Sequence, residues 1–139
     1  MNEKILIVDD EKDVCEALKE SLNREGYEVE VCYTGVAALL LLNEKKYDLV
    51  LIDIRLEGRI SGIDLIKTAV DLTPKTAVVV ESATPKKQLE EILKKEGLLE
   101  RVDKILEKPS DLRLDHFNHF IQHGYFTHFF AFTPLLFIF

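Results

Sequence analysis

The chain has few cysteines, and those that it has are not arranged as a metal or redox site. Its two cysteines, Cys15 and Cys32, lack CxxC spacing, and residues 1–115 contain neither histidine nor phenylalanine. This pattern indicates neither a zinc site nor a redox pair. We expect both side chains to be small thiols of the core, Cys15 in a helix and Cys32 in a strand.

The chain also lacks an excess of basic residues and a membrane-length apolar run. With 18 Lys and Arg against 25 Asp and Glu, the formal charge is −7, which argues against direct nucleic-acid binding. No cationic region or cleavage site follows Met1, so a cytoplasmic rather than a secreted protein is expected. The apolar C-terminal stretch is interrupted by Pro134 and is shorter than the roughly 20 residues that a membrane span requires.

Apolar runs and helical patterns alternate along the sequence. The length of 139 residues suits a single core without disulfide or metal support. Patterning predicts strands near residues 4–8, 29–31, 47–53, 76–80 and 102–106. Helices are predicted over residues 12–25, over residues 35–45 as a largely covered helix, and from residue 63 towards Pro74. A further helix is predicted between Pro85 and Gly97, with Leu89, Ile92 and Leu93 pointing inward. Five strands joined by helices predict an α/β fold, a three-layer sandwich around a parallel sheet.

Two of the predicted strands end on carboxylates. The opening strand runs into Asp9 and Asp10, and the third strand ends on Asp53. Because ligands gather at the carboxyl edge of parallel sheets, these acids can meet at one rim. The sequence therefore predicts a site for a hard cation there.

These residues resemble the receiver domain of two-component response regulators. The resemblance rests on VDDE at the first strand, Asp53, Ser82-Ala83 after the fourth strand, and Lys108-Pro109 after the fifth, in order over roughly residues 3–110. Each element is weak alone, but four in register are specific. The resemblance implies a flavodoxin-like strand order, 2-1-3-4-5, in a receiver domain that we place at residues 1–110.

The resemblance assigns a role to each matching residue. Asp53 would be the phosphoacceptor, forming an acyl phosphate with Mg²⁺ as cofactor. Asp10 and Asp53 would be direct ligands, Asp9 would act mostly through water, and the main-chain carbonyl of Arg55 would complete the set. Lys108 would pair with Asp53 and then with the phosphoryl group.

Smaller side chains complete the implied phosphoryl site. The hydroxyl of Ser82 would bind a phosphoryl oxygen, and Ala83 would leave room for the group. One departure concerns Ile105, at a position where the family usually has Tyr or Phe, so the aromatic part of the family's switch is missing. The loop after Asp53 and the stretch from residue 97 to residue 108 are also longer than usual.

The C-terminal segment differs abruptly in composition. All eight phenylalanines and all four histidines lie beyond residue 115. We expect residues 111–139 either to replace part of the fifth helix or to be non-native in origin. A segment that mediates dimerisation or membrane-surface contact is the functional alternative.

We therefore expect a non-enzymatic phosphoacceptor domain that works in a phosphorelay. Its expected partners are a histidine kinase or phosphotransfer protein and a downstream protein target, with no DNA-binding or enzymatic output domain. One alternative is a receiver-like interaction module that is never phosphorylated. Another is a Mg²⁺-dependent phosphatase with Asp53 as nucleophile, which Arg55 disfavours because such enzymes carry an acid two residues after the nucleophile.

Overall fold

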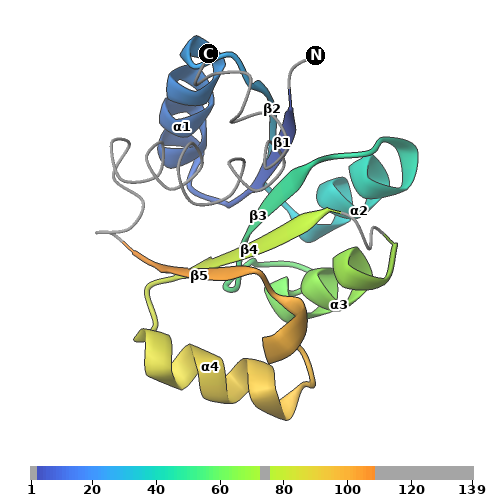
Figure 1. The fold of residues 1–139 in the computed structure, drawn as a ribbon, viewed down its shortest axis with the longest axis vertical. Helices are drawn as coiled ribbons and strands as arrows, with labels where there is room; N and C mark the ends of the chain where they lie inside the picture. Colours follow the sequence, from blue (N-terminus) through green and yellow to red (C-terminus); the bar gives the residue numbers. More distant parts are fainter. Residues whose placement is uncertain (1–2, 73–75, 109–139) are drawn as a thin grey trace, which may run out of the picture.

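Strands and helices alternate along the chain in the computed structural model, which describes residues 3–72 and 76–108 (Figure 1). The strands are β1 (Lys4–Val8), β2 (Glu28–Cys32), β3 (Leu49–Asp53), β4 (Ala77–Ser82) and β5 (Lys104–Glu107). The helices are α1 (Lys12–Arg24), α2 (Gly35–Glu44), α3 (Gly62–Leu72) and α4 (Lys86–Lys95), with a short 3-10 helix, η1 (Leu99–Arg101), before β5. The predicted alternation is confirmed over these residues.

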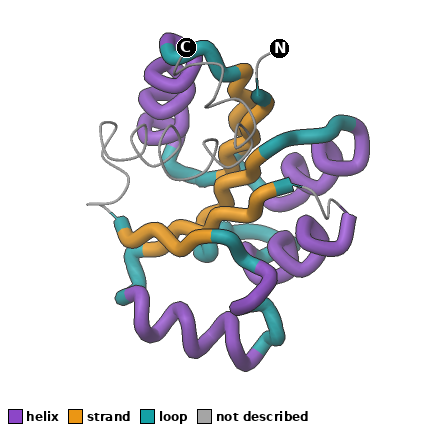
Figure 2. The backbone as a smooth tube through the Cα atoms, viewed as in Figure 1, coloured by secondary structure: helices purple, strands orange, loops and turns teal. Residues whose placement is uncertain are grey.

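The five strands form one parallel sheet in the order β2-β1-β3-β4-β5, as labelled in Figure 1. Figure 2 shows the strands in orange and the helices in purple. This order confirms the expected fold class. Parallel neighbours need crossover connections, and the helices supply them. Because all strands run the same way, the segments that follow β1, β3, β4 and β5 meet at one edge of the sheet.

Both faces of the sheet are buried. On β1, Ile5 and Ile7 point to one face and Leu6 and Val8 to the other, and all four are fully buried. Helix α1 covers the first face, whereas α2, α3 and α4 contribute to the core on the second (Figure 1). Burial of one such aliphatic side chain contributes about 1.5–3 kcal/mol, so the central strands are firmly held.

Two helices bury fewer of their apolar side chains than the sequence pattern predicts. On α2 the buried stripe is Gly35, Ala38 and Leu42, which leaves Val36 and Leu40 on the exposed side. The expectation of a largely covered helix over residues 35–45 was therefore wrong. Each turn of a helix offers only one side to the sheet, and an apolar composition does not change this geometry.

Helix α4 shows the same effect at one position. Its buried residues are Leu89 and Leu93, and Ile92, expected to point inward, is exposed. Ile92 precedes Leu93 by one residue and so lies about 100° around the helix from it. A single position off the buried stripe is enough to expose a large side chain.

The ends of β4 and β5 also differ from the predicted ranges. Ser82 is the last residue of β4 rather than the first residue after it, because it pairs with Glu107 of β5. Strand β5 begins at Lys104 because Asp103 accepts a hydrogen bond from the backbone N–H of Val78, at 2.7 Å, through its carboxylate. These shifts place the polar end of β4 directly beside the end of β5.

A close backbone approach fixes the loop after β3. A Cβ atom on Gly62 would lie 2.3 Å from the carbonyl oxygen of Ile54, which no side chain tolerates. Glycine at the start of α3 thus lets the helix pack directly against the residue that follows Asp53. The loop after β3 is positioned by this contact.

Some sequence-based expectations lie outside the described residues. They concern the end of the receiver domain at residue 110, the C-terminal segment 111–139 and the relation of that segment to a fifth helix. Within the described ranges, no helix is long and apolar enough to cross a membrane.

Candidate functional site

The carboxyl ends of β1 and β3 bring the predicted acids together. These strands are paired with Val8 opposite Ile52, so Asp9, which follows β1, lies beside Asp53, the last residue of β3. Asp9 and Asp53 are buried, whereas Asp10 and Glu11 are exposed. One carboxylate oxygen from each of the four lies within 4.8 Å of the others. The predicted meeting of Asp9, Asp10 and Asp53 at one rim is thus observed.

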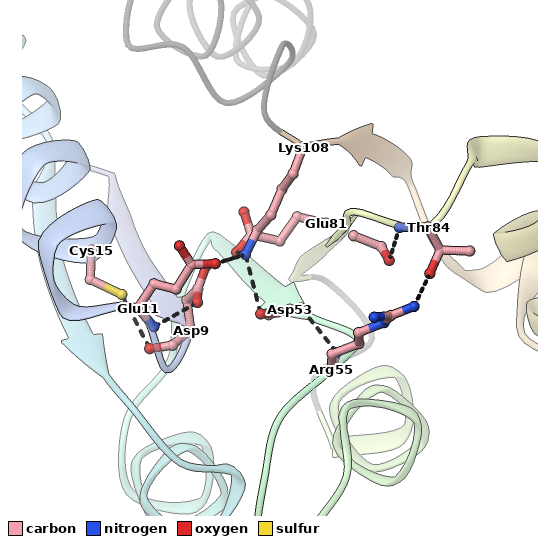
Figure 3. Close-up of polar contacts among 9 residues, drawn as sticks. Asp9, Glu11, Cys15, Asp53, Arg55, Glu81, Thr84 and Lys108 are labelled. Carbon is pink, nitrogen blue, oxygen red and sulfur yellow. Dashed lines mark hydrogen bonds and ion pairs between the residues drawn. The ribbon is translucent and has the colours of Figure 1, made fainter.

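Lys108 reaches into this cluster from the end of β5 (Figure 3). Its Nζ donates hydrogen bonds to Asp9 at 2.9 Å, to Glu11 at 3.1 Å and to Asp53 at 3.2 Å. Its backbone N–H also donates to the carbonyl oxygen of Ser82, at 2.8 Å. The main chain of Lys108 is therefore tied to the end of β4 while its ammonium group joins acids from β1 and β3.

The ammonium group of Lys108 is charged in this setting. Its side chain is only 12% exposed. Burial lowers the pKa of Lys108, but the Glu81, Asp9 and Asp53 carboxyl groups outweigh that effect and raise the pKa above its ordinary value. A compact, permanently charged group thus lies beside the Asp53 carboxylate.

The two buried aspartates have opposite pKa shifts. Burial favours the neutral form of Asp9, yet hydrogen bonding from the Glu81 carboxyl group, from the backbone N–H of Glu11, at 2.9 Å, and from Lys108 holds its pKa below the ordinary value. For Asp53, burial dominates and raises the pKa, although the backbone N–H of Arg55, at 2.9 Å, and Lys108 counteract it. Asp9 is therefore the more firmly anionic of the pair.

Ser82, the last residue of β4, and Arg55, in the loop after β3, border the cluster. Ser82 is buried, and its hydroxyl oxygen accepts a hydrogen bond from the backbone N–H of Thr84, at 2.9 Å. That bond does not use the hydroxyl proton, which stays free to donate. The Arg55 guanidinium donates to the Thr84 hydroxyl at 3.1 Å, so its side chain points away from Asp53 towards the β4 loop (Figure 3).

Glu81 is an acid of this pocket that the sequence analysis missed. It is fully buried on β4, in register with Asp53 of β3. Its Oε1 lies 3.6 Å from the Nζ of Lys108, too far for a hydrogen bond, and the Asp9 carboxyl group is its other polar neighbour. Burial raises the pKa of Glu81 well above its ordinary value, and the adjacent Asp9 adds to this effect. The sequence does carry one signal of this role, because Glu81 is a charged residue at the end of the apolar run TAVVVES.

The donor set fits a small divalent cation. Asp9, Asp10, Glu11 and Asp53 offer only carboxylate oxygens, which are the ligands that hard cations such as Mg²⁺ prefer. Burial and the neighbouring Asp9 raise the pKa of Asp10, which is the expected result when acids crowd together without enough positive charge. Glu11, like Glu81, was not predicted as a member of the cluster, although it directly follows Asp10.

Comparisons with known proteins agree with this geometry. The model of a protein family described as "Response regulator receiver domain" matches residues 5–114. Among curated proteins, the chain is 36% identical over 83 residues to sporulation initiation phosphotransferase F of Bacillus subtilis. That match covers 60% of this chain and 66% of the relative, just under two thirds of its length.

Solved structures show the same fold. A CheY-like response regulator receiver domain protein from Methanospirillum hungatei is 25% identical, with a TM-score of 0.76, and the match covers 88% of this chain and 92% of that one. A response regulator from Thermotoga maritima, solved in complex with Mg²⁺ and BeF, is 27% identical, with a TM-score of 0.69 over 86% and 96% of the two chains.

Proposed function

This chain belongs to the response regulator receiver domain family, and from this membership we propose that Asp53 accepts a phosphoryl group in a Mg²⁺-dependent reaction. One observation carries the proposal. The Asp53 carboxylate lies at the carboxyl end of β3, 3.2 Å from the ammonium group of Lys108 and within reach of Asp9. A nucleophile, a cation and metal-binding acids are thus collected at one edge of the sheet.

Asp53 is the nucleophile in the proposed reaction. One carboxylate oxygen attacks phosphorus of a phosphohistidine donor, and a new O–P bond forms. The P–N bond of the donor breaks, and its electron pair stays on the imidazole nitrogen. The product is an acyl phosphate on Asp53, with no net gain or loss of electrons.

Lys108 and Ser82 would stabilise the transferred group. Phosphoryl transfer depends mainly on positioning and on neutralisation of oxygen charge. The Lys108 ammonium, already bonded to Asp53, is placed to pair with a phosphoryl oxygen. The Ser82 hydroxyl, whose proton is not used by its bond to Thr84, would donate to a second oxygen. The small side chain of Ala83, next in the chain, would leave room for the phosphoryl group.

The proposed cofactor is Mg²⁺, held directly by Asp10, Asp53 and the main-chain carbonyl of Arg55, and by Asp9 mostly through water. Bound there, Mg²⁺ would neutralise charge between an anionic nucleophile and an anionic phosphoryl group. The all-oxygen donor set supports this choice, as does the Mg²⁺ named for the Thermotoga maritima relative. The exposure of Asp10 and Glu11 leaves the cluster open to solvent on one side.

The proposed partners follow from the reaction. A histidine kinase or phosphotransfer protein would supply the phosphoryl group, and a downstream protein target would read the modified state. The domain would thus be a phosphoacceptor rather than an enzyme acting on a separate substrate. Cytoplasmic location, the absence of direct nucleic-acid contacts and self-association through the C-terminal segment stay predictions.

The two alternatives differ from this proposal at specific residues. A phosphatase mechanism needs an acid two residues after Asp53, but Arg55 stands there and its side chain is bonded to Thr84. An interaction module that is never phosphorylated would not need the three hydrogen bonds from Lys108. Ile105 is buried in the core beneath α4, and this packing accounts for an apolar residue at the position without any role in switching.

Intact mass after incubation with acetyl phosphate tests the proposal. With Mg²⁺ we expect a gain of one phosphoryl group that is lost on base treatment, and no gain in the presence of excess EDTA. Asp53→Asn should abolish the adduct. Asp71→Asn is the matched control, because Asp71 is an exposed acid that pairs with Arg101 at 2.9 Å, outside the cluster. An adduct that persists in Asp53→Asn would overturn the assignment, and steady hydrolysis of unrelated phosphomonoesters would favour the phosphatase.

A further inference from the structure

The hydrogen bonds of Lys108 are fully committed in the described structure. An ammonium group has three N–H donors, and Lys108 uses them on Asp9, Glu11 and Asp53. Glu81 lies within ion-pair range, at 3.6 Å, but receives no hydrogen bond from Lys108. The pocket therefore holds one more carboxyl group than the ammonium can serve at once.

Glu81 is a buried acid that receives no hydrogen bond from Lys108. Its polar neighbours are the Lys108 ammonium, at 3.6 Å, and the Asp9 carboxyl group. Its carboxyl group is directed at the Nζ of Lys108 rather than into the apolar core (Figure 3). The residue is thus placed where it can accept a hydrogen bond as soon as Lys108 has a donor to give.

Metal binding would release such a donor. Asp9 is both a proposed ligand of the divalent ion and the closest partner of Lys108. With a divalent ion bound in the cluster, the Asp9 carboxylate would be engaged by the ion, directly or through water, so one N–H of Lys108 would lose its acceptor. Water does not readily replace it, because the Lys108 side chain is largely buried.

We propose that Glu81 is a positioning residue for Lys108, which accepts the hydrogen bond that Lys108 gives up when a divalent ion occupies Asp9. This inference rests on the proposed function, because it needs Asp9 to be a metal ligand. A carboxyl group accepts a hydrogen bond whether or not it carries a proton, so the role does not depend on the charge of Glu81. The exchange keeps the ammonium group beside Asp53 instead of leaving it to compete for Asp9.

The test is a titration with Mg²⁺ alone, without a phosphoryl donor, on full-length variants of equal charge. Glu81→Met removes the side-chain oxygens that could accept a hydrogen bond from Lys108. Glu81→Gln keeps one such acceptor, the carbonyl oxygen of its amide group. We expect Glu81→Met to bind Mg²⁺ at least about fivefold more weakly than wild type, as loss of a hydrogen bond to a charged group implies. Glu81→Gln should stay within about twofold of wild type, since its acceptor is retained.

The same substitution made in Lys108→Met separates the positioning of Lys108 by Glu81 from a general effect of charge on Mg²⁺ binding. In Lys108→Met, the further change Glu81→Met should alter Mg²⁺ affinity by less than about twofold, because no ammonium group remains to be held. Equal losses in Glu81→Gln and Glu81→Met, or the same loss with and without Lys108, would overturn the inference. A wild-type chain that binds no Mg²⁺ would instead overturn the metal site of the proposed function.

A structural readout covers the case in which the double variant does not fold. In a crystal structure of the wild-type chain with Mg²⁺, the Lys108 Nζ should lie within hydrogen-bond distance of a Glu81 oxygen and should have left Asp9. If the Nζ still contacts Asp9 while the metal is bound, Glu81 has no such role. Thermal unfolding of Glu81→Met, expected at a higher temperature than for wild type, shows that weaker binding is not a folding defect.

Discussion

Asp53 and Glu81 are cross-strand neighbours in the parallel pairing of β3 with β4, and both are buried. Two acids at such positions would repel each other in a dry core, and the single ammonium group of Lys108 contacts both. The pocket therefore depends on one cation for its electrostatic balance.

The first prediction concerns removal of that cation. Lys108→Met leaves the Asp9 carboxylate, which is fully buried, without its ammonium partner. Because loss of one partner strands a buried charge, we expect the free energy of unfolding to fall by about 3–5 kcal/mol in the absence of divalent ions. Urea denaturation at pH 7 measures this value, and the exposed Lys94→Met serves as the control. Equal midpoints for the two variants would contradict the prediction.

The second prediction concerns stabilisation by metal. Mg²⁺ should raise the stability of the folded state, because it binds the clustered acids only when the chain is folded. At a hundredfold excess over the dissociation constant, the gain is about 2.7 kcal/mol. Thermal unfolding with Mg²⁺ and with EDTA measures the difference. Asp10→Asn should largely remove it and Asp71→Asn should not, so a full Mg²⁺ effect in Asp10→Asn would exclude Asp10 as a ligand.

Most of the site could be predicted from sequence because its residues follow the ends of strands. Asp9, Asp53 and Lys108 each come directly after or at the end of a buried run, and parallel strands bring such positions to one edge. Glu81 could not be placed in the same way, because a glutamate inside an apolar strand gives no sign of which group it faces. Its partner, Lys108, is contributed by a different strand and is distant in sequence.

The fold was predictable for a similar reason, and its deviations have local causes. The alternation of strands and helices is encoded in periodicity, which is a property of each segment alone. The start of β5 is not encoded in its own segment, because Asp103, just before the strand, accepts a hydrogen bond from the backbone N–H of Val78 in β4. The exposure of Leu40 and Ile92 likewise depends on which side of each helix meets the sheet.

The third prediction concerns the thiols. Burial raises the pKa of both Cys15 and Cys32 to about 12, so neither thiol should react with a disulfide reagent at pH 8 while the chain is folded. Full reaction of two thiols is expected after unfolding in denaturant, and spectrophotometric titration measures both states. Fast labelling of either residue in the native protein would show that its surroundings open more easily than the structure implies.

The same shift predicts a dependence of stability on alkaline pH. In the unfolded chain the pKa of Cys32 is the ordinary 9.0 of a thiol, whereas burial raises it to about 12 in the folded chain. The folded state therefore holds this proton over that window, and stability is lost as pH rises through it, by about 1.4 kcal/mol per pH unit. Urea denaturation of wild type and Cys32→Ala between pH 9 and 11 should show the steeper decline in wild type. Parallel declines would contradict the assignment.

The fourth prediction concerns Gly62. In most helices a change from glycine to alanine is favourable by roughly 0.5–1 kcal/mol. Here the new Cβ would meet the backbone of Ile54, and the loop after Asp53 must move. We expect Gly62→Ala to lose about 1–3 kcal/mol of stability and to slow phosphorylation by acetyl phosphate. A stabilised variant with unchanged phosphorylation would mean that this contact does not position the site.

The hydrogen bond from the backbone N–H of Lys108 to the carbonyl oxygen of Ser82 has a practical consequence for mutagenesis. Since the link uses main-chain atoms only, replacing either side chain does not remove it, and the other side chain keeps its anchor point. In variants of Ser82 and Lys108 that stay folded, defects in phosphorylation can then be attributed to the missing functional group itself. The pair offers a clean way to divide the chemistry of this domain between a hydroxyl and an amine.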